Sequence, residues 1–124
     1  MDLKQISLGL LVTKDSLDLN DAITVDLYTC PAGMECFVTK VVLRKIDPTI
    51  LTTVKLSFGW EATALNVVAE TAALTTDTDE YTIFTIIANP VRGVAAGIFK
   101  VDVAIAEGTA RTGSIDVFGY LVPA

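Results

Sequence analysis

The residues best suited to chemistry in this sequence are two cysteines that flank a turn. The stretch YTCPAGMEC at 28–36 holds Cys30 and Cys36, which are the only cysteines of a 124-residue chain without histidine. Zinc needs four ligands, so these two thiolates would need carboxylates or a second copy of the chain. A thioredoxin-like redox site is excluded by the spacing and by the absence of a βαβ pattern. We expect unbonded thiols, with a strained disulfide as the open alternative.

The absence of histidine also removes most catalytic machinery. No Ser-His-Asp or Cys-His relay can form, and no histidine can act as general base. Two acidic clusters could hold a hard cation such as Ca²⁺ through oxygen ligands. One consists of Asp77, Asp79 and Glu80, and the other of Asp15, Asp18 and Asp21. Neither cluster matches the EF-hand loop. Solvated acidic loops are the simpler interpretation. We predict no enzyme, no cofactor and no metal, although a carboxylate-only glycosidase stays as a minor alternative.

The composition points to contacts with other protein surfaces. Hydrophobic residues make up 52% of the chain and charged residues 19%, yet no apolar run reaches the roughly 18 residues needed to span a bilayer. The surplus apolar surface therefore predicts burial in a core or between subunits. A net charge of −6 disfavours binding to nucleic acid. The N-terminus does not look like a signal peptide, so we expect synthesis in a cytoplasm and no membrane partner.

Alternation with a period of two is the dominant pattern along the chain. Apolar and polar residues alternate over 6–13, 23–28, 37–44, 53–58, 99–105 and 115–121, with less regular strands expected at 66–73 and 80–87. Turn residues interrupt these segments about every ten positions, which is typical of sandwiches and barrels. We predict one all-β domain over 1–124, a two-sheet antiparallel sandwich of about eight strands with jelly-roll or Greek-key topology.

The cysteine-containing stretch is expected to form a hairpin. Pro31, Ala32 and Gly33 suit a three-residue turn with glycine in the left-handed position. That turn would pair Tyr28 with Cys36, Leu27 with Phe37, Val25 with Thr39 and Ile23 with Val41, so that the apolar faces of both strands coincide. Both thiols would then lie on the opposite face.

Four aromatic residues are candidates for an interface, because aromatic side chains dominate interface energetics: Trp60, Phe84, Phe118 and Tyr120. Phe118 and Tyr120 alternate with the apolar Val117 and Leu121, so one of the two sets must face something other than the core. Trp60 could alternatively stack on a sugar, but a core or interface plug is the more common role of a lone tryptophan.

The order of these features resembles small structural proteins of tailed bacteriophages. VDLYTCPAGMECFVTKVVLRKID is similar to a hairpin frequent in capsid-decoration, head-fibre and tail proteins, with matches at Tyr28, Pro31, Ala32, Gly33, Val38 and Val41. FGWEATALNVV and the closing strand SIDVFGYLV follow in the expected order. The cysteines that flank the turn and Met34, where a basic residue is usual, depart from this pattern.

The resemblance implies a virion structural protein that performs no catalysis. It would be made in the host cytoplasm and would bind a phage capsid or tail lattice as an oligomer, most simply a homotrimeric capsid-decoration protein. The alternative is a ligand- or receptor-binding module of a tail or fibre, which would show exposed aromatic residues near Trp60, Tyr81 or Tyr120.

Overall fold

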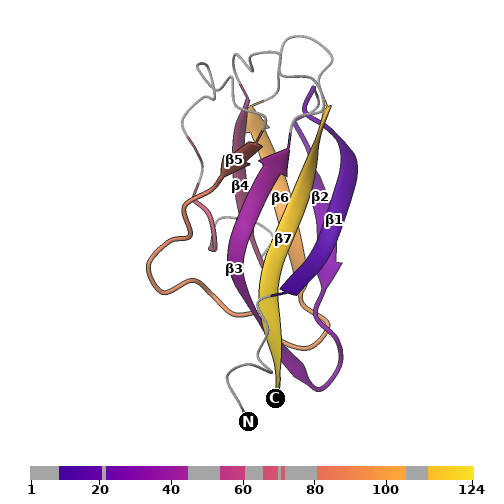
Figure 1. Cartoon of the computed structure of the whole chain (residues 1–124), viewed down its shortest axis with the longest axis vertical. Helices are drawn as coiled ribbons and strands as arrows, with labels where there is room; N and C mark the ends of the chain where they lie inside the picture. Colours follow the sequence, from indigo (N-terminus) through magenta and orange to yellow (C-terminus); the bar gives the residue numbers. More distant parts are fainter. Residues whose placement is uncertain are drawn as a thin grey trace.

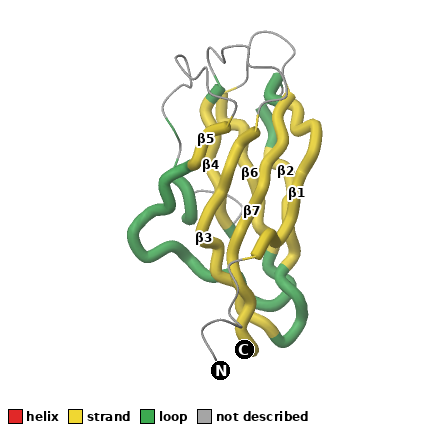
Figure 2. Tube along the Cα trace, in the orientation of Figure 1, coloured by secondary structure: helices red, strands yellow, loops and turns green. Residues whose placement is uncertain are grey.

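The structure, a computed structural model, describes residues 9–20, 22–44, 54–60, 66–69, 71, 81–105 and 112–124. This part of the chain is built of strands and loops (Figure 2). The strands are β1 (Gly9–Asp18), β2 (Thr24–Thr29), β3 (Met34–Arg44), β4 (Lys55–Gly59), β5 (Tyr81–Ile83), β6 (Ile98–Ile105) and β7 (Thr112–Pro123).

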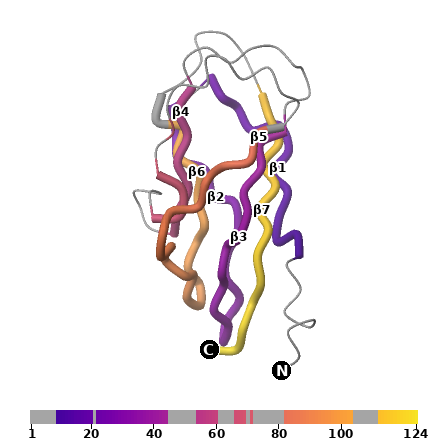
Figure 3. Tube along the Cα trace, turned by 60° about the vertical axis from the view of Figure 1, so that its left-hand side comes forward, coloured from indigo at the N-terminus to yellow at the C-terminus, as the bar shows by residue number. Residues whose placement is uncertain are grey.

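The strands form two antiparallel sheets, which confirms the predicted all-β sandwich. One sheet has the order β1-β7-β3-β5 and the other has the order β2-β6-β4, and Figure 3 shows the two layers separated. The strand expected at 66–73 is reduced, among the described residues, to a single bridge between Phe58 of β4 and Val68. The C-terminus, after β7, lies at one end of the sandwich (Figure 1).

The core lies between the sheets and is filled by the alternate residues of each strand. Three aromatic pairs mark its centre: the ring centroids of Phe58 and Phe84 are 5.1 Å apart, those of Phe58 and Phe99 are 6.2 Å apart, and those of Trp60 and Phe99 are 5.1 Å apart. The predicted inward faces of β4, β6 and β7 are confirmed, because these side chains are buried in one cluster: Leu56, Phe58, Phe99, Val101, Val103, Ile115 and Val117.

The predicted turn forms, but the predicted hairpin is wrong. Met34 N donates to Pro31 O at 3.3 Å, and Gly33 has a φ of 75°, as the turn requires. β2 then pairs with β6 and β3 pairs with β7, so the turn carries the chain from one sheet to the other. The expected partners Tyr28 and Cys36 lie in different sheets.

The segment 93–97 takes the backbone hydrogen bonds that the hairpin would have used. Cys30 N donates to Gly97 O at 2.8 Å, Cys36 N donates to Gly93 O at 2.9 Å, and Gly93 N donates back to Cys36 O at 2.8 Å. Both flanking strands thus bury an apolar face against the opposite sheet, an arrangement that a two-stranded ribbon does not provide. This gain in burial is the physical reason why the local turn signal did not determine the pairing.

Two β-bulges change which side chains point outward. The ladder between β3 and β7 shifts register between Val38 and Lys40, so Val38 and Val41 are both buried although they are three residues apart. Phe37, expected on the inward face, therefore points outward. A second shift at Leu10 in β1 leaves that side chain 55% exposed instead of alternating inward.

The strand expected at 80–87 is short in the structure. Only Tyr81–Ile83 forms a strand, β5, and it pairs with β3 at the edge of its sheet. Phe84 is buried but Ile83 is 53% exposed. After β5 the chain runs as a loop along the side of β3 (Figure 2).

Candidate interaction surface

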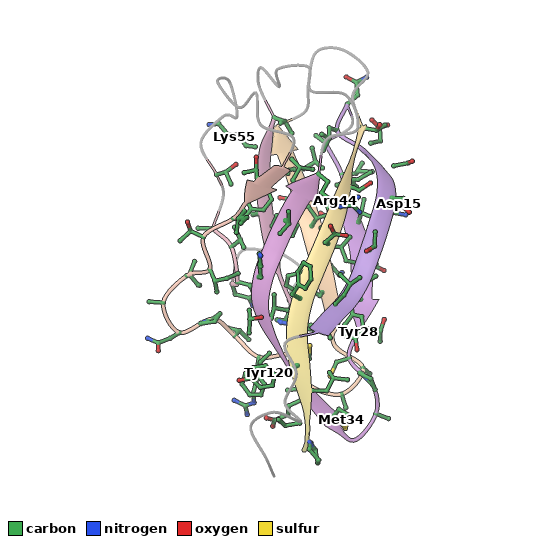
Figure 4. The ribbon with its side chains drawn as sticks, viewed as in Figure 1. Asp15, Tyr28, Met34, Arg44, Lys55 and Tyr120 are labelled. Atoms are coloured by element: carbon green, nitrogen blue, oxygen red, sulfur yellow. The ribbon has the colours of Figure 1, made fainter. Side chains whose placement is uncertain are left out.

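The outward face of the β1-β7-β3-β5 sheet carries a pair of stacked rings. Phe37 of β3 and Tyr120 of β7 are opposite one another in the ladder. Their ring centroids are 5.1 Å apart and their planes differ by 13°. Both residues are partly exposed, and Figure 4 shows Tyr120 toward the C-terminal end of β7. Such a pair offers a rigid apolar platform at low cost in side-chain entropy.

A third aromatic residue extends this platform along the same face. Phe118 lies opposite Lys40 in the β3–β7 ladder and opposite Leu10 in the β1–β7 ladder. The ammonium of Lys40 lies 5.6 Å from the centroid of the Phe118 ring, which is within the range of a cation–π contact. We call Phe37, Phe118 and Tyr120 the aromatic platform.

The other end of the same face is a polar network whose members already bond one another. Asp116 accepts a hydrogen bond from Thr13 Oγ1 at 2.7 Å and forms a two-point ion pair with the guanidinium of Arg44. The hydrogen bond from Arg44 is the main cause that lowers the pKa of Asp116, against the opposing effect of burial. Ser114 Oγ also donates to Asp15 at 3.1 Å. The charged side chains of Asp116, Arg44 and Asp15 at this end thus already have partners within the domain.

A shallow hollow adjoins the aromatic platform. It has a volume of about 370 Å³ and is lined by Phe37, Pro90, Val91, Arg92 and Val94. Val91 is 44% and Val94 is 55% exposed. Arg92 Nε lies 3.2 Å from Glu35 Oε2, so an ion pair borders the hollow. A mostly apolar depression with one charged border suits an inserted apolar side chain of another protein.

The structure divides the four predicted interface residues into two pairs. Phe118 and Tyr120 lie on the outward face, on the platform. Trp60 and Phe84 are 9% and 6% exposed and belong to the core cluster, so their rings stabilise this domain from within. Trp60 therefore fills part of the core and offers no stacking surface for a sugar. Tyr81, named for the same alternative, has a side chain outside the described residues.

Sequence reasoning missed Phe37 and the hollow. Strict alternation placed Phe37 inward with Val41, and only the bulge at Val38 and Lys40 reverses it. The hollow depends on a loop, 84–94, that is close to β3 in space but distant in sequence.

Both cysteines are buried and free. Burial raises the pKa of Cys36 to about 12, and the neighbouring Cys30 adds to the increase. The Cys30 thiol donates to Met34 O at 3.4 Å. These uncharged, inaccessible thiols lack the thiolate character of a nucleophile or a metal ligand.

The acidic clusters do not form a described cation site. Asp15 bonds Ser114, and Asp18 Oδ1 accepts from Asn20 N at 2.8 Å. Asp21, Asp77, Asp79 and Glu80 lie outside the described residues. Within the described ranges, no group of three or more metal-binding side chains occurs, and no helix is long and apolar enough to cross a membrane.

Comparison with known proteins relates the fold to phage capsids. No family model matches the sequence, and neither does any curated protein. A chain of the acid-stable capsid of Helicobacter pylori bacteriophage KHP30 superposes with a TM-score of 0.58 at 19% identity, over 94% of this chain and 97% of that chain. This chain shares its fold with phage capsid components. A chain of the cyanophage Pam1 capsid asymmetric unit gives a TM-score of 0.58 at 20% identity, over 93% of this chain and 86% of the other.

Proposed function

We propose that this chain is a non-enzymatic structural protein of a virion, and specifically a capsid-decoration protein. The observation that carries the proposal is the match of the whole domain to chains of two phage capsids, over nearly the full length of each. The chain and the two chains that it matches are thus similar in size. The resemblance of the sequence to small phage structural proteins supports the same role independently.

The topology supports a jelly-roll sandwich. An eight-stranded jelly roll has two four-stranded sheets. The order β1-β7-β3-β5 matches one of them, and the order β2-β6-β4 matches the other if the described residues of 66–71 take the fourth place beside β4. The bridge between Val68 and β4 supports this assignment. In this fold the sheets form a rigid support, and function depends on which outward side chains remain unpaired.

In this proposal the aromatic platform binds the lattice of coat subunits. Phe118 and Tyr120 are partly exposed rings held on the long strand β7, so a partner can bury them without reordering the backbone. A typical specific contact buries about 800 Å² on each partner, and repetition over many equivalent sites strengthens weak single contacts. The decoration role also implies a homo-oligomer, with a trimer as the simplest state.

The decisive experiment uses coat shells of the phage that encodes this chain, prepared without it. Purified protein is expected to co-sediment with the shells, to saturate at a fixed ratio to coat subunits, and to raise the temperature at which the shells open. Tyr120→Ala should weaken this binding, whereas Thr29→Ala, at an exposed position of β2 in the other sheet, serves as the matched control. Failure to bind the shells, together with absence of the chain from purified virions, would refute the proposal.

A further inference from the structure

The exposed large apolar side chains of the described residues lie on the two lateral sides of the sandwich. Leu10 and Ile23 are on one side, at 55% and 46% exposure, and Ile83, Val91 and Val94 are on the other, at 53%, 44% and 55%. The central strands β3, β6 and β7 carry none of them. Single exposed apolar residues are ordinary, but their separation into two opposite groups indicates two contact surfaces.

The two sides can be defined by their strands. The acidic edge is the name that we give to β1, β2 and the residues between them, 19, 20, 22 and 23. These belong together because β1 and β2 are edge strands of their two sheets and contact each other. We name β4, β5 and the described residues of 66–71 and 84–97 the basic flank. Figure 1 shows β1 and β2 on one side of the sandwich and β4 and β5 on the other.

The charges of the described residues separate in the same way. The acidic edge holds Asp15, Asp18 and Asp26 against one Lys14, a net charge of −2. The basic flank holds Lys55 and Arg92 and no described acid, a net charge of +2. Figure 4 shows Asp15 and Lys55 on opposite sides of the molecule.

These charges remain available to a partner. The Asp26 side chain is 65% exposed, and Lys100 Nζ lies 3.8 Å from its Oδ1 atom. The Arg92 side chain is 55% exposed although it pairs with Glu35. Exposed pairs of this kind contribute little to stability, so each of the two residues can exchange its partner at little cost.

Two hollows lie on the basic flank. The depression at Phe37 and Arg92 opens there, and a second one of about 390 Å³, lined by Val68, Ile83, Ile87 and neighbouring residues, lies between β5 and the segment 66–71. Exposed apolar side chains lie on both sides, Leu10 and Ile23 on the acidic edge and Ile83, Val91 and Val94 on the basic flank. The two sides therefore differ in charge, and both offer apolar contacts.

We infer that copies of this chain bind side by side, with the acidic edge of one copy against the basic flank of the next. A contact between two identical sides would place like charges together, whereas edge against flank pairs opposite charges and puts Leu10 and Ile23 at the hollows. Such a head-to-tail contact closes into a ring or continues as a row. The inference deepens the proposed function, since it assigns contact between neighbouring copies to the two lateral sides, which share only Phe37 with the aromatic platform and leave Phe118 and Tyr120 to the coat subunits.

Sedimentation velocity of the purified protein in low salt tests this contact. The flank variant is Lys55→Glu with Arg92→Glu, the edge variant is Asp18→Lys with Asp26→Lys, and the swap variant carries all four changes. The unaltered chain should associate as its concentration rises, and each half-variant should stay monomeric. The swap variant should associate again, because its edge is basic and its flank acidic. Added salt should weaken both associations.

Three results would overturn the inference: an unaltered chain that is monomeric at every concentration, a half-variant that associates normally, or a swap variant that does not recover. Circular dichroism and thermal melting identify any variant that fails to fold, and Leu10→Ser, which removes only an exposed apolar group, then provides a second test by weakening association. No capsid is present in this experiment. Its failure would therefore leave the proposed binding to coat shells to be judged by its own assay.

Discussion

Gly93 lies directly against the ring of Trp60, and the two residues connect the loop after β5 to the core. A Cβ built at position 93 would lie 2.6 Å from Cη2 and Cζ2 of that ring. The same glycine exchanges two backbone hydrogen bonds with Cys36. One residue without a side chain thus lets the loop close over the tryptophan and bond to β3.

We expect Gly93→Ala to destabilise the domain, because either the indole or the loop backbone must move. Overpacking of a well-filled core typically costs about 1–3 kcal/mol. Urea denaturation followed by Trp60 fluorescence measures the change, with Ala95→Ser at an exposed position as the control. An unchanged free energy of unfolding would show that the ring is free to shift.

Truncation of the aromatic platform should weaken assembly more than folding. Phe118→Ala and Tyr120→Ala each remove a partly exposed ring, so the isolated domain should lose little stability while binding to coat shells falls about tenfold or more. The measurements are the affinity for shells and the melting temperature of the free domain. Equal losses in both quantities would indicate that the rings serve only the fold.

Acidic pH should reduce the stabilisation that Asp116 provides at the polar end of the β1-β7-β3-β5 sheet. The pKa of Asp116 is lowered in the folded protein, chiefly by the hydrogen bond from Arg44. Its stabilising contribution is therefore complete above the ordinary carboxyl value of 3.8 and is lost as pH falls through the folded value.

Asp116→Asn should lower stability at neutral pH by about 1–3 kcal/mol and flatten its acid dependence. Denaturation curves measured between neutral and strongly acidic pH are the test, with Asp26→Asn, a largely exposed carboxylate, as the matched control. Parallel curves for the unaltered chain and Asp116→Asn would contradict the assigned role of the ion pair.

The two thiols should resist modification in the folded protein. Cys30 and Cys36 are 1% and 0% exposed, and burial raises both pKa values. Iodoacetamide at mildly alkaline pH should therefore label neither thiol until denaturant is added, as read by mass spectrometry. Rapid labelling of the native protein would mean that the turn at 31–33 opens.

The alternation of apolar residues determined much of this protein. The inward faces of β4, β6 and β7 follow from a period of two, because successive side chains of a strand point to opposite sides. The turn at 31–33 was equally local, since proline and glycine restrict its backbone directly. Phe118 and Tyr120 could be placed outward for the same reason, because β7 keeps its alternation through that region.

Only the tertiary structure decided what those local signals left open. The partners of β2 and β3 depended on long-range burial between two sheets, so a well-formed turn led to a corner instead of a hairpin. Phe37 faces outward because a bulge adds one residue to β3 in its ladder with β7. The alternation of apolar and polar residues does not indicate such a bulge. Trp60 and Phe84 fill the core because strands that are distant in the sequence meet there. The hollow exists because the fold brings the loop 84–97 next to β3. The two oppositely charged sides depend in the same way on the contact between β1 and β2.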